Sequence, residues 1–346
     1  MKAARWYNKK DVRVEEIETP ETLGATEVKL AVKYAGICGS DLHEYLGGPI
    51  FIPTEQEHPY SHRKAPITMG HEYCGEVVAV GDQVTNLVPG DRVVVEPILT
   101  ADGQLVGQYN IDPNLGFIGL AGDGGFAEFS VVEACNCHKL PDGVDFQQGA
   151  LTEPAAVALY AVRQSKFRVG DSAVVFGAGP IGLLIIDALN AAGATEIYAV
   201  EVSPERQELA RELGAIAIDP TAEDAVAKIQ ELTNGGADIS FEVTGVPKVL
   251  AQSLEALKND GECIVVSIWE TEASFHPNEL VIKEKTMKGI IAYRHIFPDV
   301  LKLMTQGYFS KDKLVTKVIK LDDIVEEGFE ALVKEKSQIK ILVSPE

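Results

Sequence analysis

The chain has 346 residues, which is long for one hydrophobic core, so two domains with a cleft between them are expected, and such clefts favour enzymes. A composition of 46% hydrophobic and 24% charged residues is that of a folded globular protein and argues against disorder. A net charge of −21 argues against nucleic acid and anionic membranes as partners.

The sequence also predicts a cellular compartment. Its N-terminal segment lacks the apolar core of a secretory signal, and no apolar run reaches membrane-spanning length. The five cysteines form an odd, sparse set that does not look like a secreted disulfide framework. We therefore expect a cytoplasmic protein with no membrane partner, in which cysteines can serve as metal ligands.

Two kinds of structure follow one another along the chain. Up to about residue 150, short alternating stretches such as 27–34 and 76–80 are separated by Gly, Pro and Asp, which predicts strands and loops. From about residue 171, apolar strands alternate with helices, which is typical of a parallel sheet covered by helices. The segments of this second part are SAVVFGAG, PIGLLIIDALNAAG, EIYAVEV and SPERQELARELG, then strands at 237–243 and 262–268 around a helix at 248–257. The unit ends near residue 290, and a helix at 299–304 and the terminal strand QIKILV are expected to return to the first domain.

A glycine-rich turn in the second part predicts a dinucleotide site. Gly177, Gly179 and Gly182 form G-x-G-x-x-G directly after an apolar strand and before a helix. The loop predicted to hold the pyrophosphate comprises Gly177, Gly179, Pro180, Ile181 and Gly182. Glu201 ends the next strand, where a carboxylate accepts both ribose hydroxyls and repels a 2′-phosphate, so NAD is favoured over NADP. Arg206, one helical turn further, is expected to flank the adenine or, alternatively, to offset a phosphate.

Three segments carry the residue types that bind zinc. Cys38 lies on a glycine-flanked turn, and His71 and Glu72 follow another glycine. A thiolate, an imidazole and a carboxylate together suit zinc, whereas either segment alone would be read as a buried cysteine or a surface histidine. Glu153 precedes the helix that leads into the nucleotide domain, from where its carboxylate can reach the cleft.

Motifs along the whole chain carry a family resemblance. They are CGSDLHEY, GHE, TEPAAVALYAV, FGAGPIGLL, AVEVSPERQ, SIWE and AYRHIFP. With these motifs in this order, the sequence resembles the zinc-dependent medium-chain alcohol dehydrogenases, in particular their 2,3-butanediol (acetoin) dehydrogenase branch. The resemblance implies an α/β fold: a GroES-like, β-rich catalytic domain over 1–153, completed by 294–346, and a doubly wound Rossmann NAD-binding domain over 154–293. It also implies a homodimer or homotetramer.

The resemblance further implies the activity. The expected reaction is hydride transfer between NAD(H) and a small secondary alcohol or ketone, with 2,3-butanediol and acetoin favoured and R configuration at the oxidised carbon. Sorbitol-type polyols and threonine stay open as substrates. Two alternatives are a catalytically inactive nucleotide-binding sensor or structural protein, and a zinc-free quinone or enoyl reductase, but such reductases lack the Cys and Gly-His-Glu residues present here.

Site roles are also carried over from the family by position. Cys38 and His71 are the expected zinc ligands, Glu153 occupies the place of the third ligand, and Glu72 is the acidic residue that can also approach the metal. Which glutamate binds stays open. With one thiolate, one carboxylate makes the zinc site neutral, whereas two leave it at about −1 and weaken its acidifying power.

The family's proton relay and nicotinamide contacts have counterparts here. Ser40 and His43 match the relay that takes the alcohol proton to solvent, although each could also be an ordinary turn or surface residue. Val266, Ser267 and Ile268 follow a Rossmann strand, and their backbone is expected to fix the nicotinamide carboxamide.

The sequence departs from many relatives in one respect. No cysteine occurs in ILTADGQLVGQYNIDPNLGFIGLAG, where relatives carry four cysteines that bind a structural zinc, so one catalytic zinc per chain is predicted. Packing of side chains is expected to hold this lobe instead, by Leu105, Tyr109, Leu115 and Phe117.

Weaker signals have simpler explanations. The insertion 47–66 contains His58 and His62 and is interpreted as a solvated loop over the cleft. Cys135 and Cys137 are expected on one face of a strand, as core residues and not ligands. Cys74 and Cys263 are interpreted in the same way, and Tyr45, Phe51, Phe117 and Arg294 are candidate pocket residues.

Overall fold

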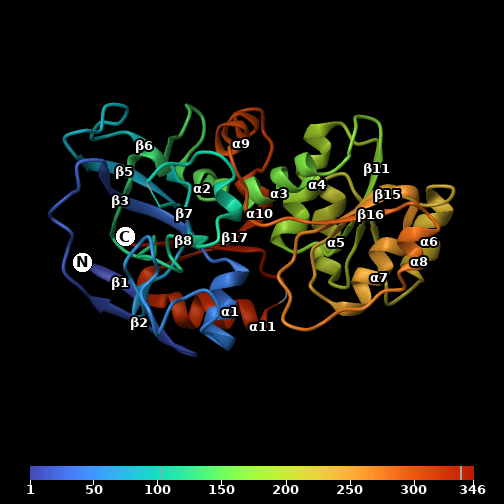
Figure 1. Ribbon diagram of the computed structural model, residues 1–346, viewed down its shortest axis with the longest axis horizontal. Coiled ribbons are helices and arrows are strands. Elements are labelled where there is room, and N and C mark those ends of the chain that lie inside the picture. The colour runs from blue at the N-terminus through green and yellow to red at the C-terminus, as the bar shows by residue number, and fades with distance from the viewer. Residues whose placement is uncertain (102, 336) are drawn as a thin grey trace. The chain divides into compact units, whose positions relative to one another are not determined.

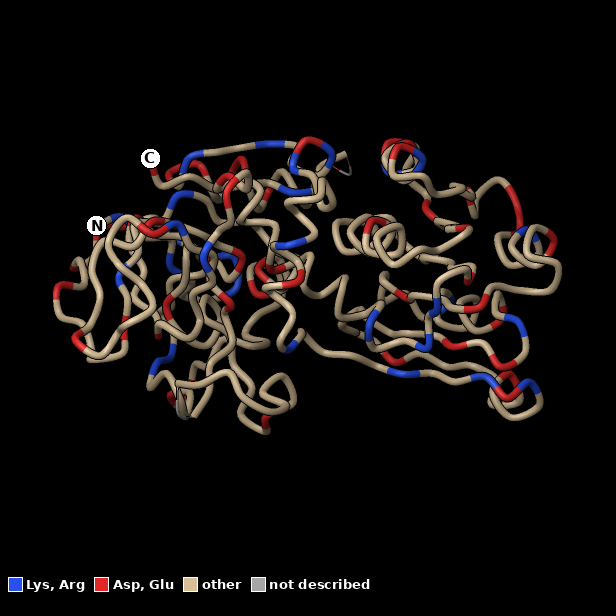
Figure 2. Tube along the Cα trace, turned by 90° about the horizontal axis from the view of Figure 1, so that it is seen from above, with Lys and Arg blue, Asp and Glu red and all other residues tan. Residues whose placement is uncertain are grey.

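A computed structural model describes residues 1–101, 103–335 and 337–346, and the chain divides into two compact units. The first unit joins Met1–Glu153 to Arg294–Glu346, and the second is Pro154–Tyr293 (Figure 1). None of the helices in the described part of the chain combines the length and apolar character that a membrane span needs. Acidic residues outnumber basic ones by 52 to 31, and Figure 2 shows them in both units, so the excess negative charge is not confined to one segment.

The first unit is built from β-sheets. Its strands are β1 (Lys2–Asn8), β2 (Asp11–Glu16), β3 (Glu27–Gly36), β4 (Ile67–Thr68), β5 (Glu72–Val80), β6 (Arg92–Val95), β7 (Ile98–Leu99), β8 (Gly116–Phe117), β9 (Phe129–Glu133), β10 (Cys137–Lys139), β17 (Val315–Lys320) and β18 (Lys340–Ser344). The largest sheet has the order β10-β6-β5-β3-β18-β17, with β9 also paired to β3. Smaller sheets are β2-β1-β4 and β7-β8. The predicted strands at 27–34 and 76–80 are confirmed as parts of β3 and β5.

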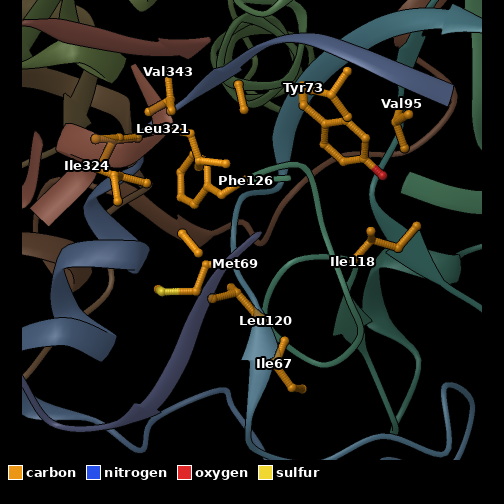
Figure 3. Close-up of a cluster of buried hydrophobic side chains, with 14 of the residues drawn as sticks. Ile67, Met69, Tyr73, Val95, Ile118, Leu120, Phe126, Leu321, Ile324 and Val343 are labelled. Carbon is orange, nitrogen blue, oxygen red and sulfur yellow. The ribbon is translucent and has the colours of Figure 1, made fainter. Parts of the chain in front are cut away.

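Short helices and turns complete this unit. They are α1 (Gly39–Gly47), α2 (Phe146–Gly149), α9 (Phe297–Met304), α10 (Lys311–Leu314) and α11 (Glu330–Lys334), with 3-10 turns at Tyr109–Ile111, Ala134–Asn136 and Leu321–Asp323 and a π-helical turn at Ile324–Phe329. Both chain ends contribute to one hydrophobic core, in which Figure 3 shows Met69 and Phe126 beside Leu321, Ile324 and Val343.

The terminal strand returns to the first unit as predicted. In β18, Leu342 and Val343 pair antiparallel with Gly36 and Ala35 of β3, and the other edge of β18 pairs in parallel with β17. Because β3 leads directly into the segment that carries Cys38, this pairing brings the end of the chain to the predicted metal site.

The second unit is a doubly wound parallel sheet. Its elements are β11 (Ser172–Phe176), α4 (Pro180–Ala192), β12 (Glu196–Val200), α5 (Pro204–Glu212), β13 (Ile216–Ile218), α6 (Ala225–Leu232), β14 (Ala237–Glu242), α7 (Pro247–Glu255), β15 (Leu257–Val265), α8 (Asn278–Val281) and β16 (Thr286–Gly289), and α3 (Thr152–Gln164) leads into it. The order is β13-β12-β11-β14-β15-β16, and every pair is parallel. The strand order therefore reverses between β11 and β14, which is where such sheets bind dinucleotides.

Two predictions about local structure were wrong. Strand β15 begins at Leu257, before the predicted 262, because its pairing with β14 already starts there and shifts register before Glu262. Cys135 and Cys137 do not share a strand, because Cys135 lies in a 3-10 turn and Cys137 begins β10. Alternation of residue type alone does not reveal a turn between two short strands.

Candidate functional site

Three of the four predicted metal-binding side chains meet in the first unit. The sulfur of Cys38, a ring nitrogen of His71 and a carboxylate oxygen of Glu72 all lie within 4.8 Å of one another. His71 and Glu72 are buried, and a side chain at Gly36 would collide with the Glu72 carboxylate, so glycine is required there. A half-buried thiol gathered with a buried imidazole and a buried carboxylate fits the ligand set of a zinc ion.

Asp41 connects two of these residues and was missed from the sequence. Its Oδ2 accepts the backbone N–H of Cys38 at 2.9 Å, and its Oδ1 lies 3.5 Å from Nδ1 of His71. Burial lowers the pKa of His71, but the charges of Asp41 and Cys38 outweigh burial, so this pKa lies well above its ordinary value. Asp41 thus stands where the outer carboxylate of a histidine metal ligand is usually found. The signal in the sequence was an acidic residue three positions after the N-cap residue Cys38.

Lys340 is the second residue that sequence reasoning missed. Its ammonium donates to both carboxylate oxygens of Glu72, at 2.8 and 2.6 Å, and to the carbonyl of Ile37 at 3.1 Å. Both side chains are almost fully buried, with exposures of 3% and 0%. A lysine inside the apolar terminal strand QIKILV was the available signal, because lysine is rarely buried without a partner.

The charge of Lys340 acts on more than one anionic group. Burial lowers its pKa, but the charge of Glu72 raises it, and the charges of Cys38 and Glu153 raise it further, so the pKa lies above its ordinary value. Glu153 is itself buried and is not part of the three-residue group described above. The charge of this buried cation therefore acts on three potential zinc ligands, of which it contacts Glu72.

Ser40 and His43 lie on α1, the helix that follows Cys38. Ser40 Oγ is 3.2 Å from Nε2 of His71, which puts its hydroxyl beside the metal-capable group. Residues three apart on a helix share a face, so Ser40 and His43 are neighbours on α1. Both side chains are half-buried.

The glycine-rich loop has the geometry that its sequence requires. Gly177 has φ +99°, which favours glycine, and a side chain at Gly182 would collide with the carbonyl of Gly177. Gly179 precedes α4, and the nearest atom that a Cβ there would meet is Nη1 of Arg206, at 3.7 Å. Helix α4 begins at Pro180, followed by Ile181. The N-terminus of this helix offers backbone N–H groups to an anion such as the pyrophosphate.

Glu201 and Arg206 lie close to this loop. The Glu201 carboxylate accepts the backbone N–H of Ala178 at 2.8 Å, that of Val202 at 2.8 Å and that of Ser203 at 2.9 Å. A carboxylate has about four acceptor positions, so capacity for a further donor is left. Since Arg206 lies near Gly179, its guanidinium is on the side of the predicted pyrophosphate.

The predicted nicotinamide segment also lies at the carboxyl end of the sheet. Val266, Ser267 and Ile268 directly follow β15, and the N–H of Val266 donates to the carbonyl of Glu242 at 2.9 Å. The Ser267 hydroxyl donates to the Glu242 carboxylate. These contacts connect the ends of two neighbouring strands.

Comparisons with known proteins agree with this geometry. Residues 24–142 match the alcohol dehydrogenase GroES-like domain, and residues 180–306 match the zinc-binding dehydrogenase domain. The chain is 62% identical to the (R,R)-butanediol dehydrogenase of Bacillus subtilis over the full length of both proteins. It belongs to the zinc-dependent medium-chain alcohol dehydrogenase family.

Two further comparisons extend this result. The (R,R)-butanediol dehydrogenase of Neisseria gonorrhoeae is 42% identical over 100% of this chain and 99% of its own. The crystal structure of 2R,3R-butanediol dehydrogenase from Bacillus subtilis superposes with a TM-score of 0.97 at 62% identity, covering 100% of this chain and 99% of that one. The protein is thus an oxidoreductase of this family, with its α/β fold.

In this dehydrogenase, hydrogen bonds hold the lobe that lacks the four cysteines. The buried Glu96 accepts from Tyr109 Oη at 2.6 Å and lies 2.7 Å from Nε2 of His138. The Tyr109 oxygen in turn accepts the backbone N–H of His295 at 2.5 Å. The expectation of apolar packing was incomplete, because three of its four residues are only half-buried, Leu105, Leu115 and Phe117.

The insertion 47–66 contains many exposed residues, as expected of a solvated loop, but hydrogen bonds also hold it at several points. The buried Glu44 accepts backbone N–H groups of residues 50–52, including those of Ile50 at 3.0 Å and Ile52 at 3.1 Å. Tyr60 donates to Asp112 at 2.7 Å, which joins the insertion to the lobe. Hydrophobic patterning does not indicate such contacts, because they join polar groups.

Among the residues that the structure describes, the other histidines and cysteines singled out from the sequence do not join the group of Cys38, His71 and Glu72. Burial lowers the pKa of His58, whereas His62 is exposed. The buried positions predicted for Cys74 and Cys263 are confirmed.

The four candidate pocket residues have mainly structural contacts. Tyr45 is buried, stacks on Phe329 with ring centroids 5.1 Å apart and donates to Glu330 at 2.9 Å. Arg294 donates to the side chain of Asn110 at 2.8 Å. The remaining two pack against the core of the first unit, Phe51 and Phe117.

Proposed function

We propose that this dehydrogenase interconverts (R,R)-2,3-butanediol and acetoin with zinc and NAD(H). The group of Cys38, His71 and Glu72 carries the proposal, because it supplies a zinc ligand set inside an alcohol dehydrogenase fold. Identity of 62% over the whole chain to a (R,R)-butanediol dehydrogenase supports this substrate and its stereochemistry.

The metal would be held by Cys38, His71 and one of two glutamates, Glu72 or Glu153. Zinc there would supply the Lewis acidity that lowers the pKa of the substrate hydroxyl, and NAD the hydride acceptor. Lys340 pairs with Glu72, so two carboxylates and a thiolate can surround a divalent ion without a net negative charge. Net negative charge, the objection to a site in which both glutamates approach the metal, is thereby removed.

Ser40 and His43 would move the proton. Ser40 lies beside His71 and takes the proton of the substrate hydroxyl, and His43, on the same face of α1, delivers it toward solvent. These roles are inferred from position in the family and are supported by the location of Ser40.

The second unit would bind NAD. The loop of Gly177, Gly179 and Gly182 would hold the pyrophosphate. Glu201, which already accepts three backbone N–H groups, would accept a ribose hydroxyl at its remaining position and disfavour a 2′-phosphate. Arg206 would face the pyrophosphate, and the backbone of 266–268 would hold the carboxamide.

Three further features belong to this proposal. One zinc per chain is supported by hydrogen bonding in the lobe, where Tyr109 and His138 both contact Glu96. A homodimer or homotetramer is supported by the sheet edge β16 and by Val281 and Ile282 beside it, which are 74% and 73% exposed. All five cysteines are free thiols, which supports a cytoplasmic location.

The test is NADH formation from (R,R)-, meso- and (S,S)-2,3-butanediol, sorbitol and threonine, on protein of known zinc content, before and after chelation. Chelator-sensitive turnover of (R,R)-butanediol with about one zinc per chain is expected. Turnover of sorbitol or threonine alone would contradict the substrate but keep the reaction type. Zinc-free protein that is inactive on every substrate would favour a nucleotide-binding sensor or a zinc-free reductase.

A further inference from the structure

Glu242 is a buried carboxylate that has no part in the proposed chemistry. It ends β14, is 0% exposed, and accepts from neutral donors on two different segments. One oxygen accepts the backbone N–H of Thr244 at 2.8 Å, the Thr244 hydroxyl at 2.5 Å and the N–H of Gly245 at 3.1 Å. The other oxygen accepts the hydroxyl of Ser267.

These hydrogen bonds join the ends of β14 and β15, and the loop after β11 packs against the same place. Thr244 lies against the glycine-rich loop after β11, since a side chain at Gly177 would come within 2.7 Å of its methyl group. Gly245, with φ +68°, lies against the segment after β15, since a Cβ there would be 3.0 Å from the carbonyl of Ile268. Glu242 therefore lies beside the place where the loops after β11, β14 and β15 contact one another.

The location of Glu242 in the sheet connects it with the cofactor. Strand β14 is next to β11, and the strand order reverses between them. In open parallel sheets a dinucleotide lies outside the carboxyl ends of the strands at this reversal. The loops that Glu242 ties together are thus the ones that a dinucleotide would touch.

We propose that Glu242 is a positioning residue for the nicotinamide cofactor, whose carboxylate fixes 243–245 and Ser267 in the shape that receives it. This rests on the proposed function, because it takes the cofactor to be NAD. A charged acceptor is suited to this role, since it can satisfy four donors at once, whereas an amide has one acceptor oxygen and brings two donors of its own.

The test is NADH binding to E242Q and S267A. Binding is measured by the quenching of protein fluorescence, so no turnover is needed. In E242Q the side chain can no longer accept from both Thr244 and Ser267, so the Kd for NADH is expected to rise about tenfold. The KM for NAD should rise in parallel, while the KM for butanediol at saturating NAD stays within about twofold. S267A, which keeps the carboxylate, should raise the Kd less, and the double variant less than the product of the two.

Glu262 provides a matched control. It is also a buried carboxylate, 3% exposed, on β15, but it accepts the backbone N–H of Lys166 at 2.5 Å and lies three residues before the end of the strand. E262Q should lower the unfolding midpoint and leave NADH binding unchanged.

Equal weakening of NADH binding in E242Q and E262Q would overturn the inference, because it would indicate general destabilisation. Unchanged binding in both E242Q and S267A would also overturn it, while the proposed function would stand. Wild-type protein that did not bind NADH would overturn the proposed function and this inference with it. If E242Q did not fold, S267A and E262Q would give the same comparison.

Discussion

Replacement of Lys340 by methionine tests whether this buried cation balances the charge of the metal site. Its ammonium lies 2.6 and 2.8 Å from the two oxygens of Glu72. At an effective dielectric constant of about 20, charges this close attract by roughly 6 kcal/mol, most of which offsets the cost of burying them. Removal of one partner leaves a buried charge uncompensated, which costs about 3–5 kcal/mol.

The effect of K340M should depend on zinc. In the zinc-free protein the Glu72 carboxylate loses its ion-pair partner, so the full destabilisation is expected. With zinc bound, the divalent charge takes over part of this compensation, and the loss of stability should be smaller. Zinc would therefore stabilise K340M more than wild type, whereas turnover should fall, because the site then carries one more negative charge.

The first measurement is urea unfolding of wild type and K340M, each with and without zinc. The second is the kcat of the zinc-loaded forms. Because the pKa of Lys340 is raised, its contribution to stability is present at neutral pH and is lost only as the pH rises through the raised pKa. K285M is the matched control, because Lys285 is also buried, donates to the carbonyl of Leu254 at 2.5 Å, and lies in the second unit. Equal losses for K340M with and without zinc would refute the reasoning.

Three other substitutions test the remaining parts of the site. C38S should reduce zinc content to near zero while C135S keeps about one zinc per chain, as measured by atomic absorption, and zinc retained in C38S would contradict the ligand assignment. E201Q should raise the KM for NAD about tenfold and narrow the preference over NADP, measured as the ratio of kcat/KM values, and an unchanged ratio would speak against a ribose contact. Y109F leaves the buried Glu96 without one donor and should lower the free energy of unfolding by about 1–3 kcal/mol with zinc content unchanged, and a zinc loss in this variant would point to a metal in the lobe.

The sequence predicted best what is encoded within short segments. The strand, glycine turn and helix around Gly177 could be recognised because each has its own local pattern. As the pattern requires, Gly177 has a positive φ and Gly182 packs closely against the carbonyl of Gly177. The elements at 27–34, 76–80 and 299–304 were found for the same reason.

Contacts between distant segments could not be predicted in this way. The pairing of Lys340 with Glu72, 268 positions earlier, depends on the register of β18 against β3, and nothing local to the strand QIKILV specifies that register. The hydrogen bond from Tyr109 to Glu96 spans only 13 positions, but it also could not be predicted, because both residues belong to segments with little regular structure. Polar networks of this kind are visible only once the fold has brought their members together.

The proposed metal site therefore depends on the completed fold of the first unit and not on its ligand segments alone. Cys38 follows β3, His71 precedes β5, and Lys340 lies on β18, which fills the other side of β3 at its carboxyl end. Without β18, Glu72 would keep its place beside β3 but would lose the cation that offsets its charge. The return of the chain end to the first unit thus supplies a component of the site, and this explains why a terminal strand with a buried lysine belongs to the catalytic unit.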